Sequence, residues 1–155
     1  MIRADGESIT YPDELFSNLP YELKTMITSI YASLLALLLV RLSLAVIKLR
    51  RKNRVSVGDG GNEELQLAIR AHSNALEYIP ITLFLLLTLE LNGAPKILIH
   101  ILGFTLIIGR ILHAIGLPAK DFRKRVLGMQ ITIYLLIGLA LLNMLFLAFT
   151  GPLKF

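Results

Sequence analysis

Four long apolar segments follow one another along the chain, separated by three short polar connections. The segments cover residues 26–47, 65–91, 97–117 and 126–149. A helix rises ~1.5 Å per residue, so each segment is long enough to cross a hydrocarbon core of about 30 Å. The pattern predicts an all-α integral membrane protein whose membrane domain, residues 25–150, is a bundle of four transmembrane helices.

The three connections carry the residues that end helices. The connection at 48–62 contains a Gly-Asp-Gly-Gly stretch, and the one at 92–95 is a tight turn with Gly93 and Pro95. The third connection covers 118–125. Outside the membrane domain lie an N-terminal flank at 1–24 and a short C-terminal tail at 151–155. The flank carries five acidic residues against two basic ones, unlike the basic start of a secretory signal.

Basic residues gather in two of the three connections. Of the sixteen lysines and arginines, five lie in 48–62 and four in 118–125, whereas 92–95 has none. Loops rich in Lys and Arg stay on the cytoplasmic side. We therefore expect these two loops to face the cytoplasm, and both chain termini and the turn at 92–95 to lie on the other side.

Composition further limits the class of protein and the kinds of site it can contain. Hydrophobic residues make up 55% of the 155 residues and charged residues 17%, against roughly a quarter charged in soluble domains. The net charge is +5, and the basic residues lie at the ends of apolar segments. There they suit binding to lipid head groups and not to nucleic acid. With no cysteine, disulfides, thiolate metal sites and a cysteine nucleophile are excluded.

The second apolar segment carries a polar stripe. Arg70, Asn74 and Glu77 stand at i, i+4 and i+7, within an arc of about 60° on a helix, with Ser73 at its edge. Ionisable residues inside a span usually face protein or a water-filled cavity. Two interpretations stay open: a hydrogen-bonding seam between helices, and a site for a zwitterionic or anionic ligand with Arg as carboxylate clamp. Glu90, at the far end of this segment, is expected to reach water.

Other segments add further polar positions. Arg110 and His113 lie one turn apart near the cytoplasmic end of the third segment, where they form a plausible second wall of the same site. Arg41 and Lys48 share a face of the first segment, where snorkelling to head groups is the simplest interpretation. Two glycines of the fourth segment, at 128 and 138, are small enough for close helix packing.

Three motifs together resemble one membrane-protein family. The stretch from Arg70 to Pro80 matches R-A-x-x-N-x-x-E-Y-x-P, and residues 109–113 match G-R-x-x-H. Arg125 and Gly128 match an R-x-x-G entry to the fourth helix. These patterns are similar to those of the MAPEG family, the membrane-associated proteins of eicosanoid and glutathione metabolism, and the resemblance covers about residues 25–150. Met129 and Gln130 stand where several members have a tyrosine.

The resemblance implies a homotrimer of four-helix bundles that binds glutathione between subunits near the cytoplasmic boundary. It assigns Arg125 the catalytic role of stabilising the glutathione thiolate, because a nearby cation favours the charged form. It implies that the glutathione site is lined by Lys48, Arg70, Asn74, Glu77, Arg110 and His113. No metal is implied.

The function that follows is that of a membrane-bound glutathione transferase or peroxidase acting on lipophilic electrophiles, with glutathione as co-substrate. The alternative is a non-catalytic membrane scaffold that binds lipids or other ligands, because the family also contains a binding protein without catalysis. A small transporter fits less well, since the chain shows no duplicated half. The expected partners are membrane lipid, further copies of the chain and a lipophilic electrophile, with no nucleic acid. A bacterial inner membrane is favoured over the endoplasmic reticulum.

Overall fold

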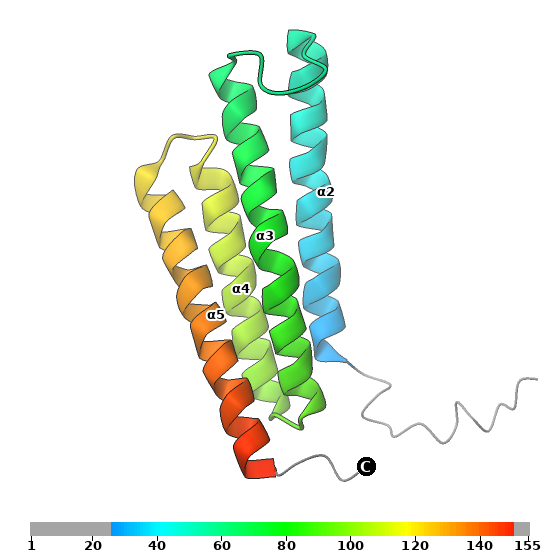
Figure 1. Ribbon diagram of the computed structural model, residues 1–155, viewed down its shortest axis with the longest axis vertical. Coiled ribbons are helices and arrows are strands. Elements are labelled where there is room, and N and C mark those ends of the chain that lie inside the picture. The colour runs from blue at the N-terminus through cyan, green and yellow to red at the C-terminus, as the bar shows by residue number, and fades with distance from the viewer. Residues whose placement is uncertain (1–25, 151–155) are drawn as a thin grey trace, which may run out of the picture.

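A computed structural model describes residues 26–150, and the flank at 1–24 and the tail at 151–155 lie outside the described residues. The described part consists of four helices, and helices that follow one another in the sequence run antiparallel (Figure 1). Their bounds are α2 Ile27–Asn53, α3 Glu63–Leu91, α4 Lys96–Gly116 and α5 Phe122–Thr150. Each has a stretch long and apolar enough to cross a membrane. The predicted all-α bundle of four membrane-spanning helices is confirmed.

The helices pack as two triangles that share α3 and α4. Both α2 and α5 contact these two central helices, but α2 and α5 do not contact each other. In Figure 1 they form opposite sides of the bundle. Leucines, isoleucines and alanines fill the core, with Leu35, Ala71, Leu106 and Leu139 among the residues that are almost fully buried. The outward faces are also apolar, as a lipid-facing surface requires.

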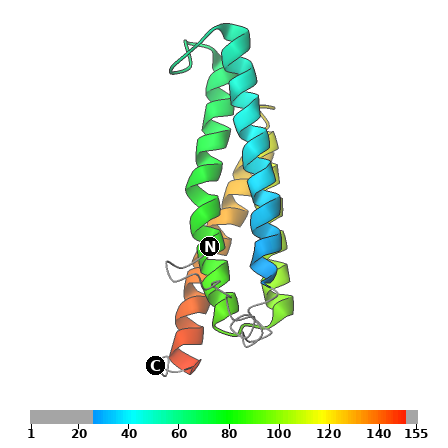
Figure 2. The same cartoon turned by 90° about the vertical axis from the view of Figure 1, so that its right-hand side faces the viewer.

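Two helices continue past the apolar segments that predicted them. α2 runs on through residues 48–53, four of which are basic, and α3 starts at Glu63. This pair therefore extends beyond α4 and α5 at the end that holds both basic connections (Figures 1 and 2). Lys and Arg are good helix formers, and cations near a helix C-terminus interact favourably with its dipole. α2 therefore ends at Asn53, well after the apolar segment, and Arg54 caps it in a left-handed conformation with φ of 55°.

The starts of α3 and α5 are capped by amide and acidic side chains. Asn62 accepts a hydrogen bond from the backbone N–H of Leu65 at 2.8 Å and caps α3. Asp121 accepts one from the N–H of Lys124 at 3.1 Å, which places the start of α5 before its basic residues. Such caps satisfy N–H groups that have no partner within the helix.

At the opposite end of the bundle, the start of α2 is capped by a residue from another helix. The carboxylate of Glu90 accepts hydrogen bonds from the backbone N–H groups of Ile27, at 2.6 Å, and Thr28, at 2.9 Å. The prediction that Glu90 reaches water therefore does not include its contact with the start of α2. An anion at a helix N-terminus is stabilised by the dipole, and here it also ties α3 to α2.

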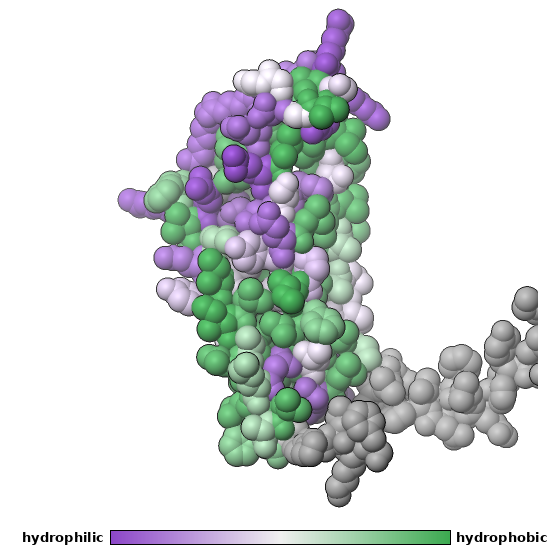
Figure 3. All heavy atoms as spheres, viewed as in Figure 1, coloured by the Kyte–Doolittle hydropathy of each residue, from purple (hydrophilic) through white to green (hydrophobic). Residues whose placement is uncertain are grey.

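Polar and apolar surfaces are separated along the bundle. Figure 3 shows hydrophilic residues gathered over the upper half of the face that α3 and α5 present, and hydrophobic residues over the lower half. Ion pairs hold the upper end together: Lys120 with Glu63 at 2.8 Å, and Lys52 with Glu64 at 3.6 Å. Both basic connections thus lie at one end of the molecule, as the charge pattern predicts.

Candidate functional site

Arg110 is a cation held in the interior of the bundle. Its side chain is 0% exposed. Nη2 donates a hydrogen bond to Oδ1 of Asn74 on α3 at 2.8 Å, and Nη1 donates to Oγ1 of Thr132 on α5 at 3.4 Å. The guanidinium also lies 5.8 Å from the centre of the Tyr78 ring, a cation–π distance. One side chain of α4 therefore links α3 and α5 through polar contacts.

Glycines bring α4 and α5 unusually close beside this cation. A Cβ at Gly128 would lie 2.5 Å from the backbone nitrogen of His113 and 2.6 Å from the carbonyl oxygen of Gly109. Only glycine permits that approach, so Gly128 fulfils the prediction of close packing. At Gly138 a Cβ would meet no described atom within 4 Å, so no helix of the described chain packs closely there. The close approach sets His113 directly against the first turns of α5.

A pocket of about 320 Å³ opens where these elements meet. It is lined by Asn74 of α3, His113 of α4, and Arg125, Val126, Met129 and Gln130 of α5. His113 is 5% exposed, and its Nδ1 has no hydrogen-bond partner among the described residues. A buried polar atom without a partner is uncommon and calls for a ligand or water. His113 therefore belongs to the pocket wall and has an imidazole nitrogen with no partner within the described chain.

The electrostatic character of the pocket is positive. Arg125 lies in the first turn of α5, where the helix dipole also favours anions. Arg123 and Lys124 stand beside it in the same turn, although cations are normally disfavoured at a helix N-terminus. The pocket is suited to a negatively charged group.

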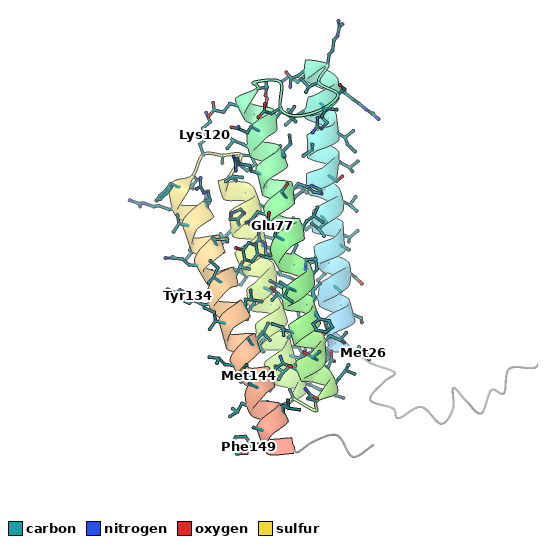
Figure 4. All side chains as sticks on the ribbon, viewed as in Figure 1. Met26, Glu77, Lys120, Tyr134, Met144 and Phe149 are labelled. Atoms are coloured by element: carbon teal, nitrogen blue, oxygen red, sulfur yellow. The ribbon has the colours of Figure 1, made fainter. Side chains whose placement is uncertain are left out.

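The predicted site residues divide into three groups. Asn74, His113 and Arg125 line the pocket together, and Arg110 lies behind its wall, bonded to Asn74. Arg70 and Glu77 are exposed on α3 and make no ion pair with each other; Glu77 stands midway along that helix in Figure 4. Lys48 is exposed on α2, across the bundle from α5.

Sequence reasoning missed two partners of the buried cation. Thr132 is fully buried, accepts from Arg110 and donates to the carbonyl of Gly128 at 2.9 Å. Tyr78 provides the ring beside the guanidinium. Thr132 follows Arg125 by seven residues and Gly128 by four, which is the spacing of a single helix face. That periodicity is the signal that identifies it.

Fold and pocket together define a class: a four-span membrane bundle with a cationic pocket between α3, α4 and α5, at the end carrying both basic connections. Residues 28–145 match the sequence model of the MAPEG family. The inner membrane protein YecN of Escherichia coli K12 is 46% identical over 119 residues, covering 77% of this chain and 91% of that protein. YecN of Escherichia coli O6:H1 matches to the same extent.

The chain belongs to the MAPEG family, as the motifs around Arg70, Arg110 and Arg125 indicated. Its four candidate spans, with its inner-membrane relative, support a multi-pass protein of a bacterial inner membrane.

Proposed function

We propose that the chain is a membrane-bound, glutathione-dependent transferase or peroxidase that acts on lipophilic electrophiles through the glutathione thiolate. The observation that carries the proposal is the pocket in which Arg125, His113 and Asn74 meet. It combines the Arg125 guanidinium, the N-terminal turn of α5 and the His113 side chain at the polar end of a membrane bundle. These are groups that stabilise an anion at the edge of a low dielectric.

Glutathione has charges that complement this surface. Its thiol, with an ordinary pKa near that of cysteine at ~8.5, would be drawn toward ionisation beside Arg125. Its two carboxylates suit Arg70 and the basic turn of α5, and its ammonium suits the exposed carboxylate of Glu77. Arg110 acts as a positioning residue, because it holds the Asn74 side chain and does not line the pocket.

The chemistry needs only the thiolate and the electrophile. In conjugation, the sulfur forms a bond to an electrophilic carbon, and the leaving group departs with its electron pair. In peroxide reduction, the sulfur attacks the distal oxygen of a hydroperoxide and an alcohol leaves, taking a proton from water. A second glutathione then displaces water from the sulfenic acid and gives the disulfide. The chain would supply orientation and a lowered thiol pKa.

The site is proposed to be completed by neighbouring copies in a homotrimer. A pocket of about 320 Å³ lies at the lower end of the ~300–1,000 Å³ typical of small-molecule sites. Since α2 and α5 lie on opposite sides of the bundle, a closed ring can set α2 of one copy against α5 of the next. That contact would bring the helix that carries Lys48 to the pocket of its neighbour.

Purified protein in detergent tests the proposal directly. Mixing with glutathione should produce the ultraviolet absorbance of a thiolate at neutral pH, and a chromogenic electrophile should then be conjugated at a rate above that of free glutathione. S-Methylglutathione, which has no thiol to ionise, is the matched control. Absence of both the thiolate signal and conjugation would favour the non-catalytic scaffold.

A further inference from the structure

A groove of about 720 Å³ lies between α2 and α4, across the bundle from the α5 pocket. α2 and α4 lie side by side there and run in the same direction (Figures 1 and 2). Twelve of the thirteen lining residues are apolar; the remaining one is Arg41. Several of the leucines and isoleucines that line it are exposed, including Leu34, Leu37 and Ile115. In a bilayer such a groove faces hydrocarbon.

Arg41 has no partner within the described residues. Its side chain is exposed to the groove and takes part in no hydrogen bond or ion pair among residues 26–150. A guanidinium cannot lose its proton under ordinary conditions and is costly in hydrocarbon, so it needs an anion or water. The apolar walls offer neither.

The depth of Arg41 suits a lipid head group. Pro118 and Ala119, which follow the end of α4, line the same groove. Arg41 therefore lies near the level at which α4 reaches the end of the bundle with both basic connections. A long basic side chain at that depth extends toward the phosphates while its stem stays in the apolar layer.

We propose that this groove is a binding site for one anionic phospholipid. One of its acyl chains lies along the leucine and isoleucine walls contributed by α2 and α4, and Arg41 donates hydrogen bonds to its phosphate. A volume of 720 Å³ is within the ~300–1,000 Å³ range of small-molecule sites. The charge of Arg41 selects an anionic lipid from the leaflet that faces the basic loops. The site is independent of the glutathione proposal.

Lipid retention by the full chain tests the site. The protein is reconstituted in vesicles of equal parts phosphatidylglycerol and phosphatidylcholine with matched acyl chains, extracted in mild detergent, and analysed by native mass spectrometry. The unmodified chain should retain phosphatidylglycerol in preference to phosphatidylcholine. Arg41→Gln should reduce this preference about tenfold, in line with the loss of charge-assisted hydrogen bonds. Arg51→Gln, which removes the same charge from the exposed extension of α2, should leave it unchanged.

A second pair of variants tests the groove itself without altering charge. Ala45 lines the groove, whereas Ala36 is exposed elsewhere on α2. Ala45→Trp should fill the groove and abolish retained phosphatidylglycerol, and Ala36→Trp should not. Equal retention of the two lipids by the unmodified chain, equal effects of Arg41→Gln and Arg51→Gln, or full retention by Ala45→Trp would each overturn the proposal. Glutathione thiolate formation should be unaffected by Arg41→Gln, so the two proposals fail separately.

Discussion

The guanidinium of Arg110 and the side-chain amide of Asn74 form the polar link between α4 and α3, with Nη2 donating to Oδ1 at 2.8 Å. Arg110 is fully buried, so this bond and the weaker one to Thr132 provide its polar partners in the interior, together with the ring of Tyr78. Asn74 in turn lines the pocket. The pair therefore couples bundle stability to the shape of the candidate site.

A double-mutant cycle on this pair should show strong coupling. Asn74→Leu leaves a buried charge without its best acceptor, which should destabilise the bundle by about 1.5–3 kcal/mol. Combining Asn74→Leu with Arg110→Leu should cost less than the sum of the single changes, because no orphan charge is left. The stability of the three variants is measured by unfolding them in detergent while circular dichroism follows the helix content. Strict additivity would show that the bond contributes no coupling.

Most of the bundle could be predicted from the sequence, because lipid leaves few alternatives for an apolar stretch of about twenty residues. The helix ends could not, since hydrophobicity marks the end of the membrane and not of the helix. Residues 48–53 are helical, although five of the six are polar. The capping of α2 by Glu90 joins residues more than sixty positions apart, and no local pattern encodes such a contact.

The candidate site was predictable in its residue types but not in its arrangement. Arg70, Asn74 and Glu77 share a face, but only Asn74 lines the pocket; Arg70 and Glu77 stay exposed. Arg110, expected in the wall, lies behind it. The position of Arg110 depends on how closely α4 approaches α5, which the glycines at 109 and 128 permit. Periodicity gives the face of a residue but not its distance from the neighbouring helix.

Membrane topology is tested by single cysteines, because the chain contains none of its own. Val57, 85% exposed in the α2–α3 connection, and Lys96, exposed at the start of α4, accept a cysteine without a positive φ. In intact cells, an impermeant maleimide should label Lys96→Cys, and Val57→Cys should react only after the inner membrane is opened. The opposite result would place the basic loops outside, against the charge rule.

Glu77 is expected to bind the ammonium of glutathione and not to hold the bundle together. It is exposed and has no ion-pair partner among the described residues, so Glu77→Gln should leave folding unchanged and weaken glutathione binding. Loss of a charge-assisted bond corresponds to about tenfold or more in Kd. Calorimetric titration measures the affinity, and light scattering the oligomer. Dissociation of the oligomer with unchanged affinity would identify a packing seam instead.

The cap of α5 should respond to acid. The backbone N–H of Lys124, and then its ammonium at 3.1 Å, lower the pKa of the Asp121 carboxyl below its ordinary value. A depressed pKa in the folded state means that the stabilisation is present above the unfolded pKa of about 3.9 and is lost as pH falls through the lower folded value. Asp121→Asn should keep the cap and lose its acid sensitivity, whereas Asp121→Ala should lose both. Amide exchange in the first turn of α5 measures each case.

Arg125 and Arg123 provide the sharpest test of the proposed chemistry, because they carry the same charge in the same turn of α5. Arg125 lines the pocket and Arg123 does not. Two residues apart on a helix, they point in nearly opposite directions, about 200° from one another. Replacing either arginine by alanine should therefore have the same effect on glutathione affinity through net charge. Only a local effect should distinguish the two variants.

Arg125→Ala should raise the pKa of the thiol of bound glutathione, because the thiolate loses its nearest cation. Each pKa unit corresponds to about 1.4 kcal/mol between protonation states, or a tenfold change in thiolate at a fixed pH below the pKa. The thiolate absorbance, titrated against pH, should shift toward the ordinary thiol value in Arg125→Ala and stay in place in Arg123→Ala. Arg125→Lys should restore part of the shift, since it returns the charge without the planar fork. Identical titrations for Arg125→Ala and Arg123→Ala would reduce Arg125 to a membrane-boundary anchor and would leave the scaffold function as the better explanation of the pocket.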